Sequence, residues 1–265
     1  MYLYIRFFLL LILKLIIYSI PLSYKYRKIF FGRHGRMQDP SYAKSIFDQH
    51  INLSKTKKGK SILELGPGDS SYSAFFAMNN FNEITLIDKD ISSSLESIKT
   101  ISKNENLQYQ ILKNSPKVFL LKLFNKTKEI KVNLIEHDFT KGLEFIPKQK
   151  FEIIFSNAVI QHMSRLQLIN FLEYLSTNSV HNSTHSHQVR FTDHLTGDKQ
   201  EFFHRKVPNI IWNSRIMQKM PFWTNRLKPH ELLKIFNNYN LFQIDKATLR
   251  SDLKRHNYKL KYLNK

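Results

Sequence analysis

The chain has 265 residues, 42% of them hydrophobic, which is enough for one large domain or a domain with extensions. It contains no cysteine, which excludes disulfides, thiolate metal sites and catalysis through a cysteine nucleophile. The formal net charge of +20 suits an anionic partner such as nucleic acid, lipid or glycan. A general drift of the composition toward lysine, without a functional cause, explains the charge equally well. Charge alone therefore does not identify a substrate.

The chain opens with a long apolar segment. Residues 3–22 are almost wholly apolar, interrupted by Arg6 and Lys14. On a helix these two side chains lie about 80° apart and share one narrow polar stripe. The segment lacks the uncharged core and small-residue cleavage site of a signal peptide. A basic flank follows it, consisting of Lys25, Arg27, Lys28, Arg33 and Arg36.

Three arrangements fit this segment. A membrane-spanning helix would carry a central lysine at a cost of about 2.5–3.5 kcal/mol. An interfacial helix tolerates the polar stripe and uses the basic flank to meet anionic lipid. In the third arrangement, the segment is a helix that packs on its own domain as a lid. We favour membrane association for residues 1–36, as an extension of a domain over 37–265, and expect a cytoplasmic protein at the inner face of the membrane.

A helix and a strand–turn–helix unit come next. Asp39 fits an N-cap and Pro40 the first helical position, which predicts a helix to about Leu53. The apolar run at 61–65 predicts a buried strand, and a Gly-x-Gly turn joins it to a helix over about 71–79. In open α/β sheets such a first turn is where nucleotide-like cofactors bind.

Acidic residues beside the glycines argue against a dinucleotide. Asp69 in the loop would repel a pyrophosphate, and Ser71 stands where the dinucleotide fingerprint has its third glycine. A cationic cofactor would be attracted instead. The stretch resembles motif I of the class I S-adenosylmethionine-dependent methyltransferases, and the residues that carry the resemblance are Glu64, Leu65, Gly66, Pro67, Gly68, Asp69 and Ser70. The alternative is an ordinary strand–turn–helix with a glycine turn.

The next strand, 84–87, ends at Asp88. This acid follows Gly66 by 22 residues, close to the spacing of about 20 between a glycine turn and a ribose-binding acid. The resemblance therefore implies that Asp88 binds the ribose of the cofactor. A capping aspartate at the strand end is the alternative.

The third part of the implied cofactor site follows an insertion. We expect a helix over 90–103, an inserted helix over 114–125 and a strand over 132–136. The resemblance then implies that Asp138 binds the adenine amino group and that Phe139 packs on the ring. The alternative is a capping aspartate beside a core phenylalanine.

The apolar run 151–155 predicts a central strand. Ser156 and Asn157 follow it and resemble motif IV of small-molecule methyltransferases, which implies that they face the sulfonium end of the cofactor. The Asn-Pro-Pro-Tyr type of motif is missing, which argues against an exocyclic base nitrogen as acceptor. His162 precedes a helix over 164–176 and is a candidate catalytic residue, with a histidine bonded to backbone as the alternative.

A further acid and base follow the next predicted strand. We expect a polar linker over 177–186 and a strand over 187–192, after which Asp193 and His194 reach the same edge of the sheet. An acid and a base there can activate a hydroxyl. Neighbours in an extended chain point oppositely, so the two need not form one dyad. His194 is the preferred general base.

The last part of the chain begins with a long connection over 197–226, in which aromatic residues alternate with arginine. Such a composition suits a sugar or a flat anionic acceptor, and a satellite core beneath a loop is an equal alternative. A helix over 228–239 and strands over 242–249 and 258–263 complete the prediction.

The resemblance covers about residues 58–250. It implies an α/β fold, a three-layer Rossmann-like methyltransferase sandwich with a mostly parallel seven-stranded sheet, and insertions at 104–130 and 197–226. It also implies methyl transfer from S-adenosylmethionine, with S-adenosylhomocysteine as product. Asp193-His194-Leu195 and residues 223–227 are similar to methyltransferases found with surface-glycan genes, which favours an oxygen of a saccharide or other small acceptor. We expect no metal, because no His and Asp cluster has ligand spacing.

Three other functions remain open. A methyltransferase acting on RNA or another nucleic acid would use the positive charge. Aminopropyl transfer on the same fold lacks the acid cluster expected for a polyamine. A membrane-associated interaction protein with a degenerate cofactor site would bind lipid and no cofactor.

Overall fold

The structure of this protein is a computed structural model. It describes residues 2–19, 37–54, 57–68, 70–115, 117–124, 128–141, 146, 148–191, 203–220 and 222–239. The chain divides into two compact units, Met1–Asn225 and Arg226–Lys265. In the second unit the structure describes one helix, α9 (Pro229–Asn238), which begins with a proline as the sequence predicts.

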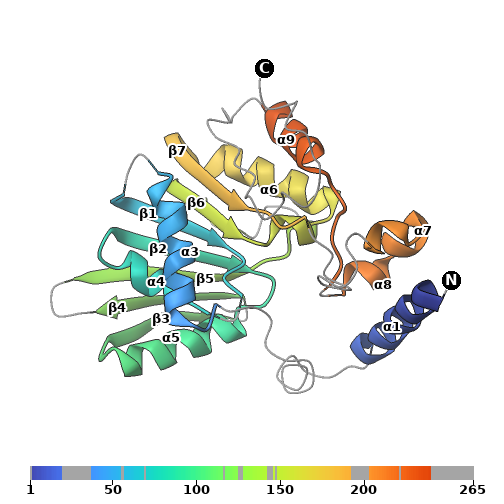
Figure 1. Cartoon of the computed structure of the whole chain (residues 1–265). Helices are drawn as coiled ribbons and strands as arrows, with labels where there is room; N and C mark the ends of the chain where they lie inside the picture. Colours follow the sequence, from blue (N-terminus) through green and yellow to red (C-terminus); the bar gives the residue numbers. More distant parts are fainter. Residues whose placement is uncertain are drawn as a thin grey trace. The chain divides into compact units, whose positions relative to one another are not determined.

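A seven-stranded sheet forms the centre of the first unit (Figure 1). The strand order is β3-β4-β5-β2-β1-β6-β7. All pairs are parallel except β3 with β4 and β4 with β5. The bounds are β1 (Gly59–Leu65), β2 (Phe81–Asp88), β3 (Gln108–Ser115), β4 (Val118–Phe124), β5 (Glu129–Glu136), β6 (Phe151–Asn157) and β7 (Ser179–Gln188).

Helices cover both faces of this sheet (Figure 1). On one face, α3 (Pro40–Asn52), α4 (Tyr72–Ala77) and α5 (Ser92–Asn104) pack on a core that includes Phe47, Met78 and Ile98. On the other face lies α6 (Arg165–Asn178), whose buried side chains include Phe171 and Leu172. The predicted three-layer α/β fold with a mostly parallel seven-stranded sheet is therefore confirmed.

Local signals at the helix ends agree with the sequence. The Asp39 carboxylate accepts hydrogen bonds from the backbone of Ser41 (3.0 Å) and Tyr42 (3.4 Å), and Pro40 is the first residue of α3. At α6, Ser164 and Gln167 form a capping box. Caps of this kind determine where each helix begins, and so which face it buries.

The predicted helix over residues 114–125 is wrong. The described residues of this range include the end of β3 and all of β4, a hairpin that extends the sheet beside β5. Phe119, Leu121 and Leu123 pack on the core beneath α5, and they alternate with a period of two, as strand residues do. The continuous apolar run concealed this alternation, because short apolar runs fit a buried strand as well as a helix.

The predicted polar linker over 177–186 is also wrong, because β7 begins at Ser179. Its polar side chains find partners across the layers. His50 Nδ1 lies 2.7 Å from Ser186 Oγ, and the Ser54 hydroxyl donates to Thr184 Oγ1 over 3.1 Å. A polar strand at the sheet edge is stable when its side chains are hydrogen-bonded. The strands predicted over 242–249 and 258–263 lie outside the described residues.

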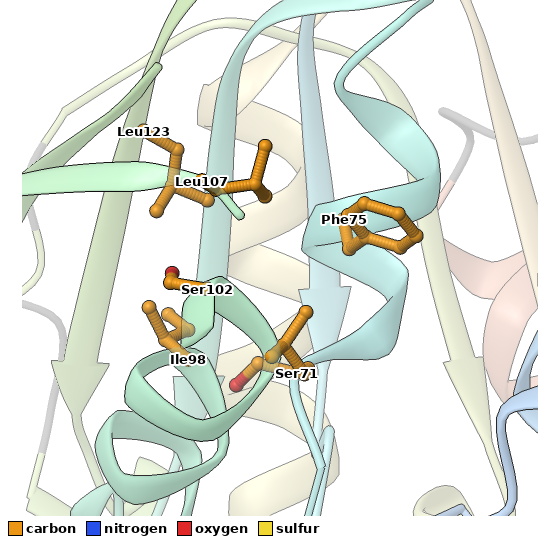
Figure 2. Close-up of a pocket in the computed structure, with 7 residues that line it drawn as sticks. Ser71, Phe75, Ile98, Ser102, Leu107 and Leu123 are labelled. Carbon is orange, nitrogen blue, oxygen red and sulfur yellow. The ribbon is translucent and has the colours of Figure 1, made fainter. Parts of the chain in front are cut away.

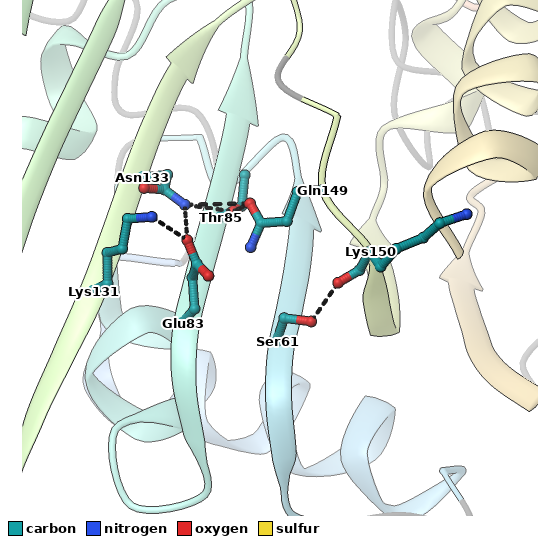
Figure 3. A network of polar contacts seen from close by, with 7 residues as sticks. All are labelled: Ser61, Glu83, Thr85, Lys131, Asn133, Gln149 and Lys150. Atoms are coloured by element: carbon teal, nitrogen blue, oxygen red, sulfur yellow. Dashed lines mark hydrogen bonds and ion pairs between the residues drawn. The ribbon is translucent and has the colours of Figure 1, made fainter. Parts of the chain in front are cut away.

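A polar network links β1, β2 and β5 to the segment before β6 (Figure 3). The buried Asn133 amide donates to Glu83 Oε1 (2.9 Å) and Thr85 Oγ1 (3.1 Å), and Lys131 forms an ion pair with the same glutamate at 2.8 Å. Gln149 Oε1 accepts from Thr85. Because these side chains lie at least three residues before the last residues of β2 and β5, the network stabilises the sheet away from the carboxyl ends of the strands.

A small cavity lies between α4, α5 and the β3–β4 hairpin (Figure 2). Its volume is about 10 Å³, room for about one water molecule. Ser71, Phe75, Ile98, Ile101, Ser102, Leu107 and Leu123 line it. Its size excludes a cofactor, so it is a packing gap in the core.

The connection after β7 builds a satellite cluster, which we define as Val207, Trp212, Met217, Met220, Phe222 and Trp223 with Leu11 of α1 (Tyr2–Ser19). Trp212 and Trp223 are buried. Of the two interpretations of the aromatic connection, the structure thus shows the satellite core. In the described part of the chain, no helix has the length and hydropathy of a membrane span.

Candidate functional site

The glycine turn lies at the carboxyl end of β1, at the centre of the sheet. Gly66 and Gly68 have φ values of +66° and +68°, which favour glycine. The Gly66 N–H donates to the Ile87 carbonyl (2.7 Å), which ties the turn to β2. A side chain at Gly66 would collide with Val159, whereas a Cβ at Gly68 would meet nothing within 4 Å. The turn therefore leaves room for a ligand above the exposed Gly68.

Asp88 connects this turn to the end of the neighbouring strand. Its carboxylate accepts hydrogen bonds from the backbone N–H groups of Gly68 (3.1 Å) and Lys89 (2.6 Å). Its own carbonyl accepts from the His137 N–H (2.8 Å), so the ends of β2 and β5 are held together as well. Burial raises the pKa of Asp88, against the lowering effect of the Gly68 hydrogen bond. The structure thus brings Gly68 and Asp88 together, as the sequence predicts.

Glu64 lies beneath the turn. It is only 1% exposed, and the Ser73 hydroxyl of α4 donates to its carboxyl group. Burial raises the pKa of Glu64 to about 8, and the charge of Asp88 adds to the shift although the Ser73 hydrogen bond opposes it. At pH 7 Glu64 is mostly neutral, and of these two carboxyl groups Asp88 is the one that bonds directly to Gly68.

We expect Glu64→Gln to be more stable than the wild type at pH 7, by at least about 1 kcal/mol. The raised pKa means that ionisation of Glu64 favours the unfolded chain, so its contribution to stability is present below pH 4.5 and lost as pH rises toward 8. Glutamine cannot ionise, and it can still accept the Ser73 hydrogen bond. Chemical denaturation of both proteins at pH 5, 7 and 8 measures the difference, which should widen with pH. A constant difference would show that Glu64 is ionised throughout.

The other predicted residues of the turn differ in their accessibility. Pro67 and Ser70 are buried, and the Ser70 hydroxyl accepts from the Tyr72 N–H (3.2 Å) at the start of α4. Asp69 lies outside the described residues. The Ser70 hydroxyl therefore bonds at the start of α4, and Gly68 is the most exposed of the described residues of the turn.

Asp138 and Phe139 follow β5. The Asp138 carboxylate accepts from the Thr140 N–H (3.0 Å) and the Gln167 side chain (2.7 Å). Partial burial opposes its ionisation, but these hydrogen bonds outweigh it and its pKa is lowered. The Phe139 ring is 3% exposed and packs edge-on against Phe171, with centroids 5.4 Å apart. Both residues fit the alternative of a capping aspartate beside a core phenylalanine, and their roles toward adenine stay predictions.

Ser156 and Asn157 end β6, the other neighbour of β1. Ser156 is fully buried, and its hydroxyl lies 2.9 Å from His187 Nδ1. The Asn157 amide donates to Met37 Sδ at 3.8 Å, while its Oδ1 is buried with no hydrogen-bond partner among the described residues. The next residue, Ala158, has φ +58° and donates to the Gln188 carbonyl. Such a backbone is uncommon in alanine, and no local feature of the sequence predicts it.

His162 also lies at this edge of the sheet. Its Nδ1 is 2.5 Å from the Trp223 carbonyl, which can only accept a hydrogen bond, so Nδ1 carries the proton. Asn225 fixes the same loops, since its amide donates to the carbonyls of Ile160 (2.9 Å) and Met163 (3.1 Å). The sequence did not indicate this role for Asn225. The other two catalytic candidates, Asp193 and His194, lie outside the described residues.

No family model matches the chain, and no curated protein matches it significantly. Several solved structures, in contrast, match the chain. One is the cyclopropane synthase MmaA2 from Mycobacterium tuberculosis, with 8% identity and a TM-score of 0.47, covering 74% of this chain and 59% of that one. A second is phosphoethanolamine N-methyltransferase 2 from Haemonchus contortus in complex with S-adenosyl-L-methionine. It has 14% identity and a TM-score of 0.45, and the match covers 81% of this chain and 40% of that one.

A third is the N-methyltransferase NodS from Bradyrhizobium japonicum in complex with S-adenosyl-L-homocysteine. It has 14% identity and a TM-score of 0.37, and the match covers 55% of this chain and 60% of that one. The chain spans less than two thirds of the length of all three structures, and 49% and 56% of two other matches. S-adenosylmethionine-dependent methyltransferases are thus among the structures it matches, and they are the class that the glycine motif resembles.

Proposed function

We propose that this protein binds S-adenosylmethionine at the carboxyl ends of β1 and β2 and transfers its methyl group. The observation that carries this proposal is the pairing of an open glycine turn with an acid. Gly68 leaves free space above its backbone, and Asp88 accepts the Gly68 N–H. Ligands of open α/β sheets bind outside the carboxyl ends of the strands, and the glycine turn after β1 lies at the centre of that edge.

Asp88 suits this cofactor in two ways. A carboxylate accepts hydrogen bonds from both hydroxyls of a ribose, and its negative charge attracts a cationic ligand. Glu64 stays beneath the turn, where it positions α4 through Ser73 and contributes little charge at neutral pH.

The acceptor that we propose is a hydroxyl group of a saccharide or other small molecule. The support is the resemblance of residues 193–195 and 223–227 to methyltransferases found with surface-glycan genes, together with the absence of an Asn-Pro-Pro-Tyr motif. The aromatic residues of the connection give no further support, since Trp212 and Trp223 are buried in the satellite cluster.

When bound, S-adenosylmethionine supplies an electrophilic methyl group on a sulfonium. The part of the protein is to hold the acceptor in line with that methyl group and to remove the hydroxyl proton. We propose that His162 performs the second task. Because its Nδ1–H donates to the Trp223 carbonyl, the basic lone pair is on Nε2. We assign the proton transfer to this atom, with His194 as the other candidate base.

We expect His162→Gln to lower turnover at least about tenfold while the affinity for S-adenosylmethionine stays within twofold. Glutamine retains an amide that can donate to Trp223 but has no basic nitrogen. Steady-state kinetics and calorimetry on the same preparation separate the two effects. The pH profile should lose its acidic limb in the variant, and an unchanged profile would remove His162 from catalysis.

Labelling identifies the acceptor class. Purified protein is incubated with methyl-labelled cofactor and fractions of cell extract that contain glycans, small metabolites or RNA. Label in an alkali-stable ether of the glycan or small-molecule fraction supports the proposal. Label in RNA that falls steeply with salt would replace it by a nucleic-acid methyltransferase.

A further inference from the structure

The helix α1 exposes an entirely apolar face. Six large side chains recur at intervals of three and four residues, so they lie on one side of the helix. Their exposed fractions run from 39% for Phe8 to 61% for Leu9. We call this face the α1 stripe, and it consists of Ile5, Phe8, Leu9, Ile12, Leu13 and Ile16. Surface helices normally present polar residues to water, so a stripe of this kind marks an interaction surface.

The opposite face of α1 is already packed. Leu11 is buried in the satellite cluster, and Leu10 and Leu15 pack against it. Lys14 Nζ lies 5.4 Å from the centroid of the Phe222 ring. The helix is therefore held along one side by its own protein, and the stripe is what remains on the other side. A partner must approach the stripe from outside.

The short helices on the same cluster, α7 (Asn209–Trp212) and α8 (Arg215–Gln218), expose further apolar side chains. Ile210 is 86% exposed, Ile216 61% and Ile211 41%. In Figure 1 these helices lie beside α1. The satellite cluster thus supports two sets of exposed aliphatic residues, one on α1 and one on α7 and α8.

Charge distinguishes between partners. Residues 2–19 and 203–225 contain six basic residues and no acidic one: Arg6, Lys14, Arg205, Lys206, Arg215 and Lys219. A second copy of this surface would carry the same positive charge and would be repelled. Anionic lipid headgroups complement this charge, and each basic residue near such a surface adds to the attraction.

We propose that the α1 stripe, together with Ile210, Ile211 and Ile216, docks this protein onto an anionic membrane surface. The helix lies in the plane of the interface, because its inner face is packed on the protein. Aliphatic side chains enter the boundary of the acyl region, and the exposed basic residues Arg6, Lys206, Arg215 and Lys219 contact the headgroups. This proposal does not depend on the methyltransferase activity.

Vesicle flotation of the full-length protein tests the proposal. Wild-type protein should partition at least tenfold more strongly to vesicles of phosphatidylcholine with 30% phosphatidylglycerol than to phosphatidylcholine alone. The triple variant Leu9→Ser, Ile12→Ser, Ile16→Ser should lose at least tenfold of this binding. A matched control replaces Leu53, Leu112 and Leu166 by serine, which are 58%, 47% and 55% exposed and lie elsewhere. It should bind within twofold of wild type.

Circular dichroism and a melting curve establish that each variant is folded. If the triple variant fails to fold, the same comparison is made with the single variant Leu9→Ser, for which a loss of at least threefold is expected. Equal binding of wild type and variant would overturn the proposal, as would failure of the wild type to bind anionic vesicles. A wild-type dimer in light scattering that the triple variant dissociates, without vesicle binding, would assign the stripe to self-association and also overturn it.

Discussion

Replacing Asp88 by alanine is expected to weaken the binding of S-adenosylmethionine about thirtyfold. Hydrogen bonds to a charged group contribute about 1.5–3 kcal/mol each, and 1.4 kcal/mol corresponds to a factor of ten. In this protein the Asp88 carboxylate has a second function, because it accepts the Gly68 N–H and so holds the glycine turn against the end of β2. Alanine removes both the ligand contact and that anchor.

Two further variants separate these effects. Asp88→Asn keeps the size of the side chain and one acceptor oxygen but removes the charge. Its affinity for S-adenosylmethionine should therefore lie between those of the wild type and Asp88→Ala. Asp90→Ala removes a carboxylate only two residues away, which bonds to Ser92 at the start of α5. Its affinity should stay within threefold of wild type. Calorimetric titration measures all four proteins, and equal affinity of wild type and Asp88→Ala would remove the ribose assignment.

Acid is expected to destabilise the protein through the histidines that α3 and β7 place between the layers. Burial lowers the pKa values of His50 and His185 to about 4, and it lowers that of His187 as well. His50 is 4% exposed and lies against Phe155, with ring centroids 5.0 Å apart. Above pH 6.5 these rings are neutral in both the folded and the unfolded state, so they do not make the stability depend on pH. Between pH 6.5 and 4 the unfolded chain takes up the protons first, so stability falls as the pH falls.

The expected loss at pH 5 is about 2 kcal/mol for each of His50 and His185, or about 4 kcal/mol together. Glu64 acts in the opposite direction, because its raised pKa stabilises the fold as the pH falls from 8 toward 4.5. The histidine effect is therefore isolated as the difference between wild type and His50→Gln, and between wild type and the double variant with His185→Gln. Urea denaturation at pH 7 and pH 5 gives both differences.

His181→Gln is the matched control, since this histidine is exposed on the same strand. Its difference from wild type should be the same at both pH values. If the His50→Gln variant loses as much stability between pH 7 and pH 5 as the wild type does, the buried ring does not resist protonation and the explanation fails.

The parts of the fold that could be predicted are those with strong local signals. The strand before Gly66, the helix from Pro40 and the strand that ends at Asp88 each combine periodicity with a cap or a turn, and the structure has all three. The parallel arrangement follows because helices connect these strands. For the same reason the approach of Gly68 and Asp88 was predictable, since parallel strands end at one edge of the sheet.

The remainder depends on contacts that are distant in the sequence. β7 is polar and becomes a strand through partners on other elements, such as His50 136 residues away from Ser186. The hairpin of β3 and β4 gains its stability from pairing with β5. Local periodicity in the sequence predicts neither the strand β7 nor the pairing of the hairpin with β5. Likewise, His162 was a candidate from its position, but its orientation by the Trp223 carbonyl arises only in three dimensions.

Calorimetric titration of the full-length protein with S-adenosylhomocysteine at pH 7.5 is the most direct test of the cofactor site. We expect one site per chain with a Kd below about 100 µM, that is, a binding free energy stronger than about −5.5 kcal/mol. Absence of binding at 1 mM product would contradict the proposal that the carboxyl ends of β1 and β2 hold this cofactor.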